Sequence, residues 1–363
     1  MSMRRFRALV VAICAAVVVG WGGYGVAHAE EPTAQTPIFG QVSLEAATQN
    51  VAVDGSGNAW YTLPTVDKLA RVTPEGVITY YPANPGVMPS GGYPYDVAVD
   101  GATVWFTLLS ANQIGKLDTG SGAFTFYPIP TPNSEPTGIS VGGGFVWFVE
   151  RAGDKLGRLN PASGAIDEFY NWVVTDRNPV NMTDADLEDV AWSSDGVWIT
   201  GPKLKNSIAI YRESQDRFIP SAAGTGAEPM QLVVDSTGNV WVTFRGFNKI
   251  GRSALNTLGQ WDYYDLPAGQ SGPVGLFVRD NSGRRELWYT RPGANRIGYV
   301  LVGFNGTRLG VWETESPVGG SAPWGIAVNT AGNAWVASSG SRNSVIWNSP
   351  YFVSFVYLTF VRR

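Results

Sequence analysis

The chain has 363 residues, of which 44% are hydrophobic and 15% are charged, and its formal net charge is −4. An acidic chain without a basic run is a poor candidate for binding nucleic acid or anionic lipid. The single cysteine, Cys14, and the single histidine, His28, both lie within the first 29 residues. Without those residues the chain has no disulfide, no thiol nucleophile, no histidine-ligated zinc and no Ser-His-Asp relay.

Residues 1–29 read as a signal peptide. Three arginines precede an apolar stretch, Ala8–Gly20, and Ala27–Ala29 forms an A-x-A cleavage site. We therefore expect export to the periplasm or the extracellular space and a mature chain that starts at Glu30. The apolar stretch is too short to be a good membrane-spanning helix, so we expect no membrane span after cleavage; the alternative is an uncleaved anchor. Cleavage leaves 23 basic residues against 30 acidic ones, a net charge of −7. A linker, 30–36, follows.

Seven tryptophans recur at the same place in a repeated phrase, 42 to 51 residues apart; they are Trp60, Trp105, Trp147, Trp198, Trp241, Trp288 and Trp335. Around each one the chain reads as an apolar segment, a Gly-rich turn and a second apolar segment that carries the Trp. Self-similarity at this period indicates an array or a propeller. Seven units of about 45 residues, each with several short strands, predict an all-β fold, a seven-bladed β-propeller of four-stranded blades.

Each repeat contains four predicted strands. The first is short and built from small or β-branched residues, as in Val97–Val99, and the turn after it tolerates positive φ, as in Asp54–Asn58. We read Gly142–Gly144 as such a turn and not as a phosphate loop, because no helix signal follows. The second strand carries the Trp between adjacent blades. The third carries an Ile/Leu-Gly-Arg/Lys phrase, as in Ile114–Lys116, and the fourth is aromatic and ends at proline. The repeats begin near Thr48, Tyr93, Glu135, Asp186, Glu228, Gly272 and Ala322.

We predict one propeller domain over residues 37–363, because a single repeat cannot bury its apolar face alone. Two segments are candidates for the strand that closes the ring, Ile38–Leu44 and Phe352–Val361. We favour the N-terminal segment.

A longer phrase gives a family resemblance. Pro-x-Gly-Ile, Trp-Phe-Thr/Val-Glu and Ile/Leu-Gly-Arg/Lys stand clearest at Glu135–Ile139, Trp147–Glu150 and Leu156–Arg158. This phrase resembles the streptogramin B lyase (virginiamycin B lyase) family of seven-bladed propellers. The resemblance implies magnesium-assisted elimination at the ester linkage of a cyclic depsipeptide antibiotic. It also implies a site with a His after the Pro in two successive repeats, a Glu before that Pro, and the Glu that ends the Trp phrase.

This chain keeps only part of that implied site. Glu135 matches the Glu before the proline and Glu150 matches the Glu after the Trp strand, whereas the two histidine positions hold Tyr95 and Thr137. The after-proline positions of the seven repeats are Gln49, Tyr95, Thr137, Glu188, Met230, Val274 and Trp324, and none is histidine. The elimination needs a general base near neutral pH, for which imidazole is the usual group. We therefore do not expect lyase activity by that mechanism.

Acidic residues form the first candidate site. An insertion, Asn171–Asp186, precedes Glu188, which we expect to lie near Glu135 and Glu150. Three converging carboxylates would suit Mg²⁺ or Ca²⁺, and Glu135, Glu150 and Glu188 are the candidate metal ligands. Glu150 and Tyr95 are the candidate catalytic residues, because a carboxylate or a phenol with a perturbed pKa can handle a proton. The alternative is that these acids are solvated loop residues.

Aromatic residues form the second candidate site. Tyr95, Thr137 and Trp324 are the candidate ligand-binding residues, and Tyr93 and Trp172 are further rings on the entrance loops. The alternative for any one ring is packing between blades.

The sequence therefore predicts an exported, monomeric propeller that acts as a ligand- or partner-binding scaffold without a cofactor. We expect a small molecule, a polysaccharide or a protein at one face of the ring. The first alternative is a Mg²⁺- or Ca²⁺-dependent lyase or lactonase-like enzyme that acts on a cyclic ester. A second alternative, a sugar-binding module, rests on aromatic content alone.

Overall fold

The structure is a computed structural model that describes residues 39–84, 86–170, 184–204, 207–254, 258–269, 271–281, 283–317, 319–340 and 345–348. The described residues between 39 and 348 belong to one compact unit. The signal peptide, the linker, Trp172 with most of the insertion, and Phe352–Val361 lie outside the described residues. No helix in the part of the chain that the structure describes is long and apolar enough to cross a membrane.

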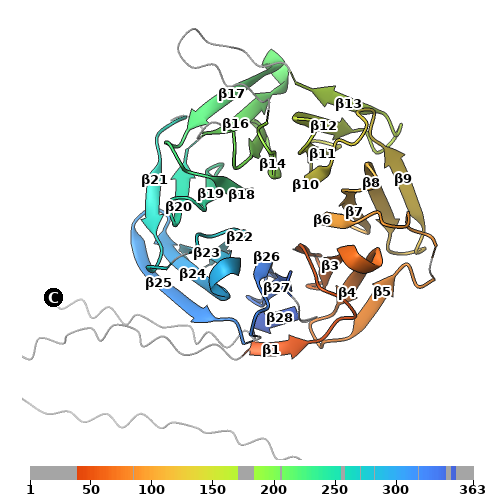
Figure 1. The fold of residues 1–363 in the computed structure, drawn as a ribbon. Coiled ribbons are helices and arrows are strands. Elements are labelled where there is room, and N and C mark those ends of the chain that lie inside the picture. The colour runs from red at the N-terminus through yellow and green to blue at the C-terminus, as the bar shows by residue number, and fades with distance from the viewer. Residues whose placement is uncertain are drawn as a thin grey trace, which may run out of the picture. The chain divides into compact units, whose positions relative to one another are not determined.

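The described strands form seven antiparallel four-stranded sheets arranged as the blades of a ring (Figure 1). The all-β propeller with four-stranded blades is thus confirmed. Within each blade the strands are named in order from the axis outward. Blades 1 to 3 are β2 (Val51–Val53), β3 (Ala59–Leu63), β4 (Lys68–Val72), β5 (Ile78–Tyr81); β6 (Pro94–Asp100), β7 (Thr103–Leu108), β8 (Gln113–Asp118), β9 (Phe124–Pro128); and β10 (Pro136–Gly142), β11 (Phe145–Glu150), β12 (Lys155–Leu159), β13 (Ile166–Phe169).

The remaining blades follow the same order. Blades 4 to 7 are β14 (Asp189–Ser193), β15 (Gly196–Thr200), β16 (Ser207–Arg212), β17 (Arg217–Ala222); β18 (Pro229–Val234), β19 (Val240–Phe244), β20 (Lys249–Ser253), β21 (Asp262–Asp265); β22 (Leu276–Asn281), β23 (Arg284–Arg291), β24 (Arg296–Gly303), β25 (Arg308–Glu315); and β26 (Pro323–Val328), β27 (Ala334–Ser338), β28 (Val345–Asn348), β1 (Phe39–Val42). Three short 3₁₀ helices complete the described elements: η1 (Pro64–Val66), η2 (Glu213–Gln215) and η3 (Pro292–Ala294).

The N-terminal strand closes the ring. β1 pairs antiparallel with β28, with Phe39 opposite Asn348 and Val42 opposite Val345, and Figure 1 shows the two strands side by side at the rim. Val42 is buried together with Leu44 against blade 1. The predicted N-terminal closure is therefore confirmed, and it ties the first segment of the ring to the last blade.

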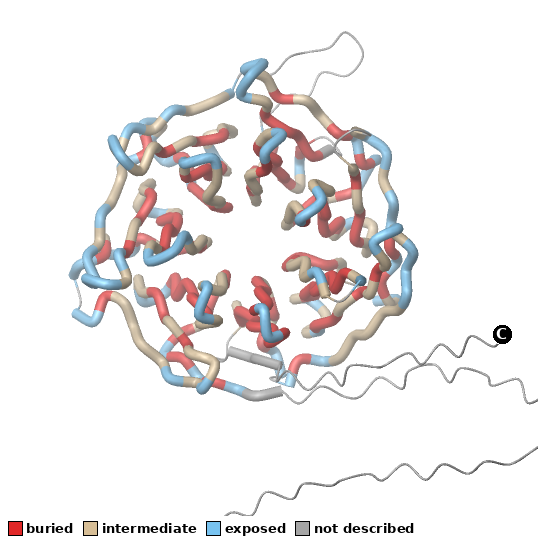
Figure 2. Tube along the Cα trace, turned by 180° about the vertical axis from the view of Figure 1, so that it is seen from behind, coloured by how far each residue is buried: buried red, intermediate tan, exposed pale blue. Residues whose placement is uncertain are grey.

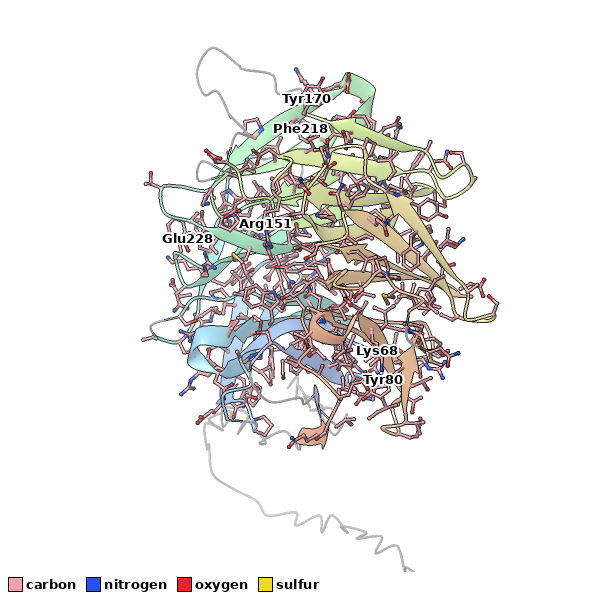
Figure 3. The ribbon with its side chains drawn as sticks, turned by 45° about the vertical axis from the view of Figure 1, so that its right-hand side comes forward. Lys68, Tyr80, Arg151, Tyr170, Phe218 and Glu228 are labelled. Atoms are coloured by element: carbon pink, nitrogen blue, oxygen red, sulfur yellow. The ribbon has the colours of Figure 1, made fainter. Side chains whose placement is uncertain are left out.

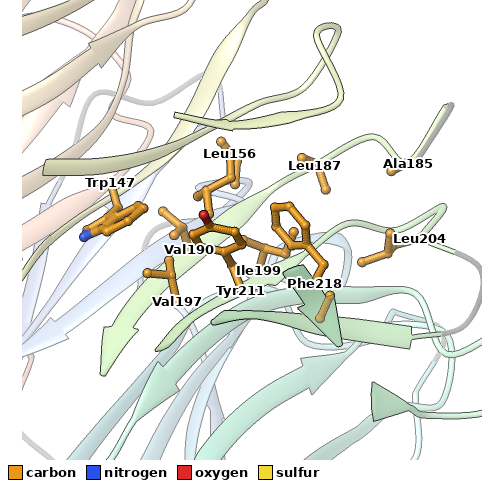
Figure 4. Close-up of a cluster of buried hydrophobic side chains, with 12 residues drawn as sticks. Trp147, Leu156, Ala185, Leu187, Val190, Val197, Ile199, Leu204, Tyr211 and Phe218 are labelled. Atoms are coloured by element: carbon orange, nitrogen blue, oxygen red, sulfur yellow. The ribbon is translucent and has the colours of Figure 1, made fainter. Parts of the chain in front are cut away.

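The repeated tryptophans join neighbouring blades, as predicted. Each lies on the second strand of its blade and is at most 2% exposed. Trp147 of blade 3 packs in one cluster with Val190 and Ile199 of blade 4 (Figure 4). Figure 2 shows that buried residues gather on the inner strands of every blade, whereas exposed residues lie in the turns and along the outer strands. The large indole fills the wedge between two twisted sheets, which explains its recurrence.

The glycine of the third-strand phrase has a packing role. In blades 2 and 3 it lies directly opposite the aromatic residue that follows the Trp, with Gly115 opposite Phe106 and Gly157 opposite Phe148. A Cβ on either glycine would lie 2.1 Å from that ring. The ring thus covers the glycine across the strand pair, which explains why the two phrases recur together.

The triple glycine is a hairpin turn, as predicted, and it also accommodates a side chain of the next blade. Gly143 and Gly144 have φ values of 63° and 83°. A Cβ on Gly142 would lie 2.3 Å from the ring of Trp192 on β14, and a Cβ on Gly143 would lie 2.8 Å from it. Glycine therefore leaves room for this indole.

Candidate functional site

Hydrogen bonds between blades fix the backbone of the after-proline positions. In five blades a Thr lies two residues after the Trp, and its hydroxyl donates a hydrogen bond to the carbonyl of the after-proline residue in the next blade. The pairs are Thr62 to Tyr95 (3.0 Å), Thr107 to Thr137 (2.8 Å), Thr200 to Met230, Thr243 to Val274 (2.7 Å) and Thr290 to Trp324 (2.5 Å). These Thr side chains are fully buried. The recurring Trp-x-Thr phrase therefore positions one residue of each following blade at the same level of the ring.

Five of these seven positions line one cavity of about 420 Å³; they are Gln49, Tyr95, Glu188, Met230 and Trp324. The other two, Thr137 and Val274, are buried at 0% and 3% exposure and do not line it. Thr137 instead donates its hydroxyl to the carbonyl of Leu187 at 2.9 Å. Of the three predicted ligand-binding residues, Tyr95 and Trp324 thus lie in the cavity wall, whereas Thr137 links blades 3 and 4.

Tyr95, Arg151 and Glu188 form a buried network in this wall. The Tyr95 hydroxyl donates to Glu188 Oε1 at 2.7 Å, and Arg151 Nη2 donates to Glu188 Oε2 at 2.8 Å and to the Tyr95 oxygen at 3.0 Å. The guanidinium also lies 5.1 Å from the centre of the Tyr95 ring. Burial and the nearby Glu188 charge hold the pKa of Tyr95 well above its usual value. A phenol that stays protonated is a donor here and a poor base near neutral pH.

The opposing charges of the network also favour the charged form of the arginine. Burial alone would lower the pKa of Arg151, but Glu188 and Tyr95 outweigh that effect and raise it. Arg151 therefore neutralises Glu188, whose side chain is only 8% exposed. The sequence carries one signal for this arginine, because Arg151 directly follows the Trp-Phe-Val-Glu phrase.

Two further ion pairs lie in the same wall. Lys203 Nζ lies 3.2 Å from Asp186 Oδ2, and Arg245 Nε lies 2.9 Å from Glu228 Oε2. Arg245 follows its Trp strand as Arg151 does in blade 3, and Figure 3 labels Arg151 of blade 3 and Glu228 at the start of blade 5. The cavity wall thus holds three cations and three anions in three pairs and has no net charge.

Polar side chains also lie at the start of the innermost strands, at the position directly after each after-proline residue. Asp96 accepts a hydrogen bond from the Ile139 amide (3.0 Å), and Asp189 accepts one from the Leu232 amide (2.9 Å). Burial raises the pKa of Asp96 to about 7 and also raises that of Asp189, to which Asp96 contributes a like charge. The sequence indicated an acidic cluster that includes Asp189 but did not connect it with Asp96, although both residues occupy a position that is glycine in three other repeats, Gly138, Gly275 and Gly325.

The same positions also hold an amide bridge across the propeller. Gln231 of blade 5 donates from Nε2 to Asn50 Oδ1 at 3.1 Å, over a separation of 181 residues, and accepts from the Leu276 amide at 3.0 Å. Blades 1 and 5 are not neighbours in the ring, so this hydrogen bond spans the central opening.

The three predicted metal ligands do not come together. Glu188 lies in the cavity wall, Glu135 is exposed with a left-handed backbone (φ 53°), and Glu150 is fully buried on β11. Within the residues that the structure describes, no three His, Cys, Asp or Glu side chains are placed to hold a metal ion. Their sequence positions put these glutamates on adjacent blades but did not fix the directions of their side chains.

Glu150 has an unusual environment for a carboxylate. Neither of its oxygens has a hydrogen-bond partner among the described residues. The nearby Ser134 hydroxyl donates to Asn112 at 2.8 Å, and Lys155 pairs with Glu168 at 2.8 Å. Burial, together with the Glu168 charge, raises the pKa of Glu150 to about 8. This candidate catalytic residue is therefore protonated near neutral pH and does not line the cavity.

Comparison with known proteins bears on this geometry. Residues 38–192 match the model of the virginiamycin B lyase family, and no curated protein matches the chain. A streptogramin B lyase structure is 25% identical, with 86% of this chain and 97% of that chain covered and a TM-score of 0.73. A catalytically inactive virginiamycin B lyase from Staphylococcus aureus with quinupristin is 23% identical, with 86% and 99% covered and a TM-score of 0.71.

A more distant protein has the same fold. The structure of YCF48 bound to D1 peptide is 14% identical, with 87% of this chain and 97% of that chain covered and a TM-score of 0.64. The resemblance read from the repeated phrase is confirmed by the family match and by the lyase structures.

Proposed function

We propose that this propeller, which resembles the virginiamycin B lyase family in sequence and fold, is an exported scaffold that binds a ligand in the cavity on its ring and does not transform it. The observation that carries the proposal is the convergence of five after-proline residues from five blades on one cavity. Pockets of about 300–1,000 Å³ with a few fixed polar groups are typical small-molecule sites, and this cavity of about 420 Å³ falls in that range.

The arrangement of acids and bases favours binding over elimination. The two positions that the resemblance assigns to histidine hold Tyr95 and Thr137, of which the first stays protonated and the second is buried in a blade contact. Glu150, the other proton-handling candidate, does not line the cavity. A carboxylate that replaced imidazole would have to reach the substrate.

Ligand binding has parallels among proteins of this fold. One lyase structure holds quinupristin and the YCF48 structure holds a D1 peptide. The A-x-A motif at Ala27–Ala29 supports export.

The test separates a scaffold from an enzyme. The purified protein is incubated with quinupristin, with and without Mg²⁺ or Ca²⁺, and linear product is sought by mass spectrometry. A chemically diverse set of small molecules, peptides and sugars is screened in parallel by ligand-observed NMR, on the wild type and on Arg151→Met. We expect no product, and at least one bound compound whose signal is lost in the variant. Cation-dependent product that disappears in Glu150→Gln would establish the lyase alternative. The absence of any bound compound would refute the scaffold.

A further inference from the structure

The cavity has two unlike walls. The paired charges come from blades 3 to 5, where Arg151, Glu188 and Arg245 contribute to it. Trp324 of blade 7 and the uncharged Gln49 at the start of blade 1 lie on the other side of the seven-blade ring. A ligand in this cavity therefore meets planar charged groups on one side and an indole on the other.

The charged wall still has hydrogen-bonding capacity. A guanidinium carries five N–H donors; within the part of the chain that the structure describes, Arg151 donates through Nη2 and Arg245 through Nε. Glu228 accepts through Oε2, and among the described residues its other oxygen accepts no hydrogen bond. Gln49 adds an amide with both a donor and an acceptor. Groups of both kinds within one cavity match hydroxyls, which donate and accept at the same time.

The equal numbers of positive and negative side chains in the cavity wall restrict the chemical class of the ligand further. The three ion pairs neutralise one another, so the cavity has no surplus charge to attract an ionic ligand. An apolar ligand that covered these pairs would remove their water without replacing its hydrogen bonds, which is costly for a charge. A ligand with many hydroxyls replaces those hydrogen bonds, and its C–H face can pack on the indole of Trp324, which is half-buried.

From these observations we propose that the cavity takes a neutral carbohydrate, with Trp324 packing against a sugar face and the Arg151–Glu188 and Arg245–Glu228 pairs binding its hydroxyls. This inference rests on the proposed ligand-binding function of the same cavity. It adds the chemical class of the ligand to that function.

The test uses defined probes. Cellotetraose, maltotetraose and tetra-N-acetylchitotetraose are titrated into the protein by calorimetry, beside tetraalanine and quinupristin as peptide probes. We expect saturable binding of at least one tetrasaccharide, with an affinity that changes less than about twofold between low and high salt because the ligand is uncharged. Trp324→Ala should weaken that binding at least about tenfold, and Trp324→Phe should weaken it less because a ring remains.

Two controls keep the result interpretable. Tyr263→Ala removes an exposed ring that does not line the cavity and should leave binding unchanged. If Trp324→Ala fails to fold, Gln49→Ala provides the loss of binding instead, since Gln49 lines the same cavity.

The outcomes separate the two proposals. Failure of all three tetrasaccharides to bind, while a peptide probe or a compound from the screen binds and is weakened by Trp324→Ala, overturns the carbohydrate assignment and leaves the ligand-binding function standing. Failure of every probe and every screened compound overturns both.

Discussion

Replacement of Glu150 by Gln tests most directly whether the Glu150 carboxyl is buried and protonated. The side chain is fully buried on β11, and its oxygens have no hydrogen-bond partner among the described residues. Burial raises the pKa of the carboxyl from 4.5 to about 8. The pKa of Glu150 is higher in the folded state than in the unfolded state. The contribution of protonated Glu150 to the free energy of unfolding is therefore fully present below about pH 4.5 and is lost as the pH rises through about 8.

The size of the effect follows from this shift. At about 1.4 kcal/mol per pH unit, ionisation of Glu150 costs the folded state on the order of 5 kcal/mol once the pH is well above 8. Glu150→Gln keeps the shape of the side chain and cannot ionise. We therefore expect the variant to have a free energy of unfolding close to that of the wild type at pH 5 and to exceed it by several kcal/mol at pH 9.

Urea unfolding followed by tryptophan fluorescence, repeated from pH 5 to pH 9, measures this difference. Asp96, whose pKa is about 7, also titrates in this range, but both proteins contain it, so its contribution largely cancels in the comparison. Glu135→Gln, at an exposed site of the same blade, is the matched control and should give a constant difference. A difference for Glu150→Gln that stays the same across the range would refute the buried, protonated carboxyl.

Three further substitutions test the packing. Gly142→Ala should cost about 1–3 kcal/mol because its Cβ would lie 2.3 Å from the Trp192 ring, and Trp192→Val in the same chain should recover most of that loss; equal losses in both backgrounds would contradict the contact. Val42→Asp should lower the melting temperature clearly, because it places a charge in the buried contact that closes the ring, whereas an unchanged melting curve would argue against closure by β1. Arg151→Met should cost about 2–4 kcal/mol by leaving Glu188 buried without its cation, and adding Glu188→Gln should restore stability; no recovery in the double variant would show that the pair is not the cause.

The architecture was predictable because one physical requirement recurs in every repeat. Each blade must fill a wedge against the next, and a Trp on the second strand does so, as Trp147 does against blade 4. Closure by the N-terminal strand was a choice between two segments, and the pairing of β1 with β28 decides it. The grouping of after-proline residues also followed from the repeat, since equal positions in equal blades lie at equal heights in the ring.

The acidic site was not predictable in the same way. A repeat alignment places Glu135, Glu150 and Glu188 at a height and on a blade, but the direction of each side chain depends on its local backbone. Glu150 occupies a strand position that other blades fill with Leu63 or Leu108, and there it is buried. The cation that neutralises Glu188 lies 37 residues away in sequence, so its partner could not be read from local spacing.

The departures from the repeat are therefore the informative positions. Where the blades agree, as in the Thr that bonds to the next blade, the residue serves the ring. Where one blade differs, a structural need no longer explains the residue type, and each such residue needs its own account. The position of Trp192 is explained by its packing against the glycine turn, Gly142–Gly144. Trp324, in contrast, lines the cavity, and its indole nitrogen has no hydrogen-bond partner among the described residues. A costly aromatic side chain that the ring does not require is better explained by a ligand, and this argument places Trp324 ahead of the buried Glu150 as the first residue to change in a search for function.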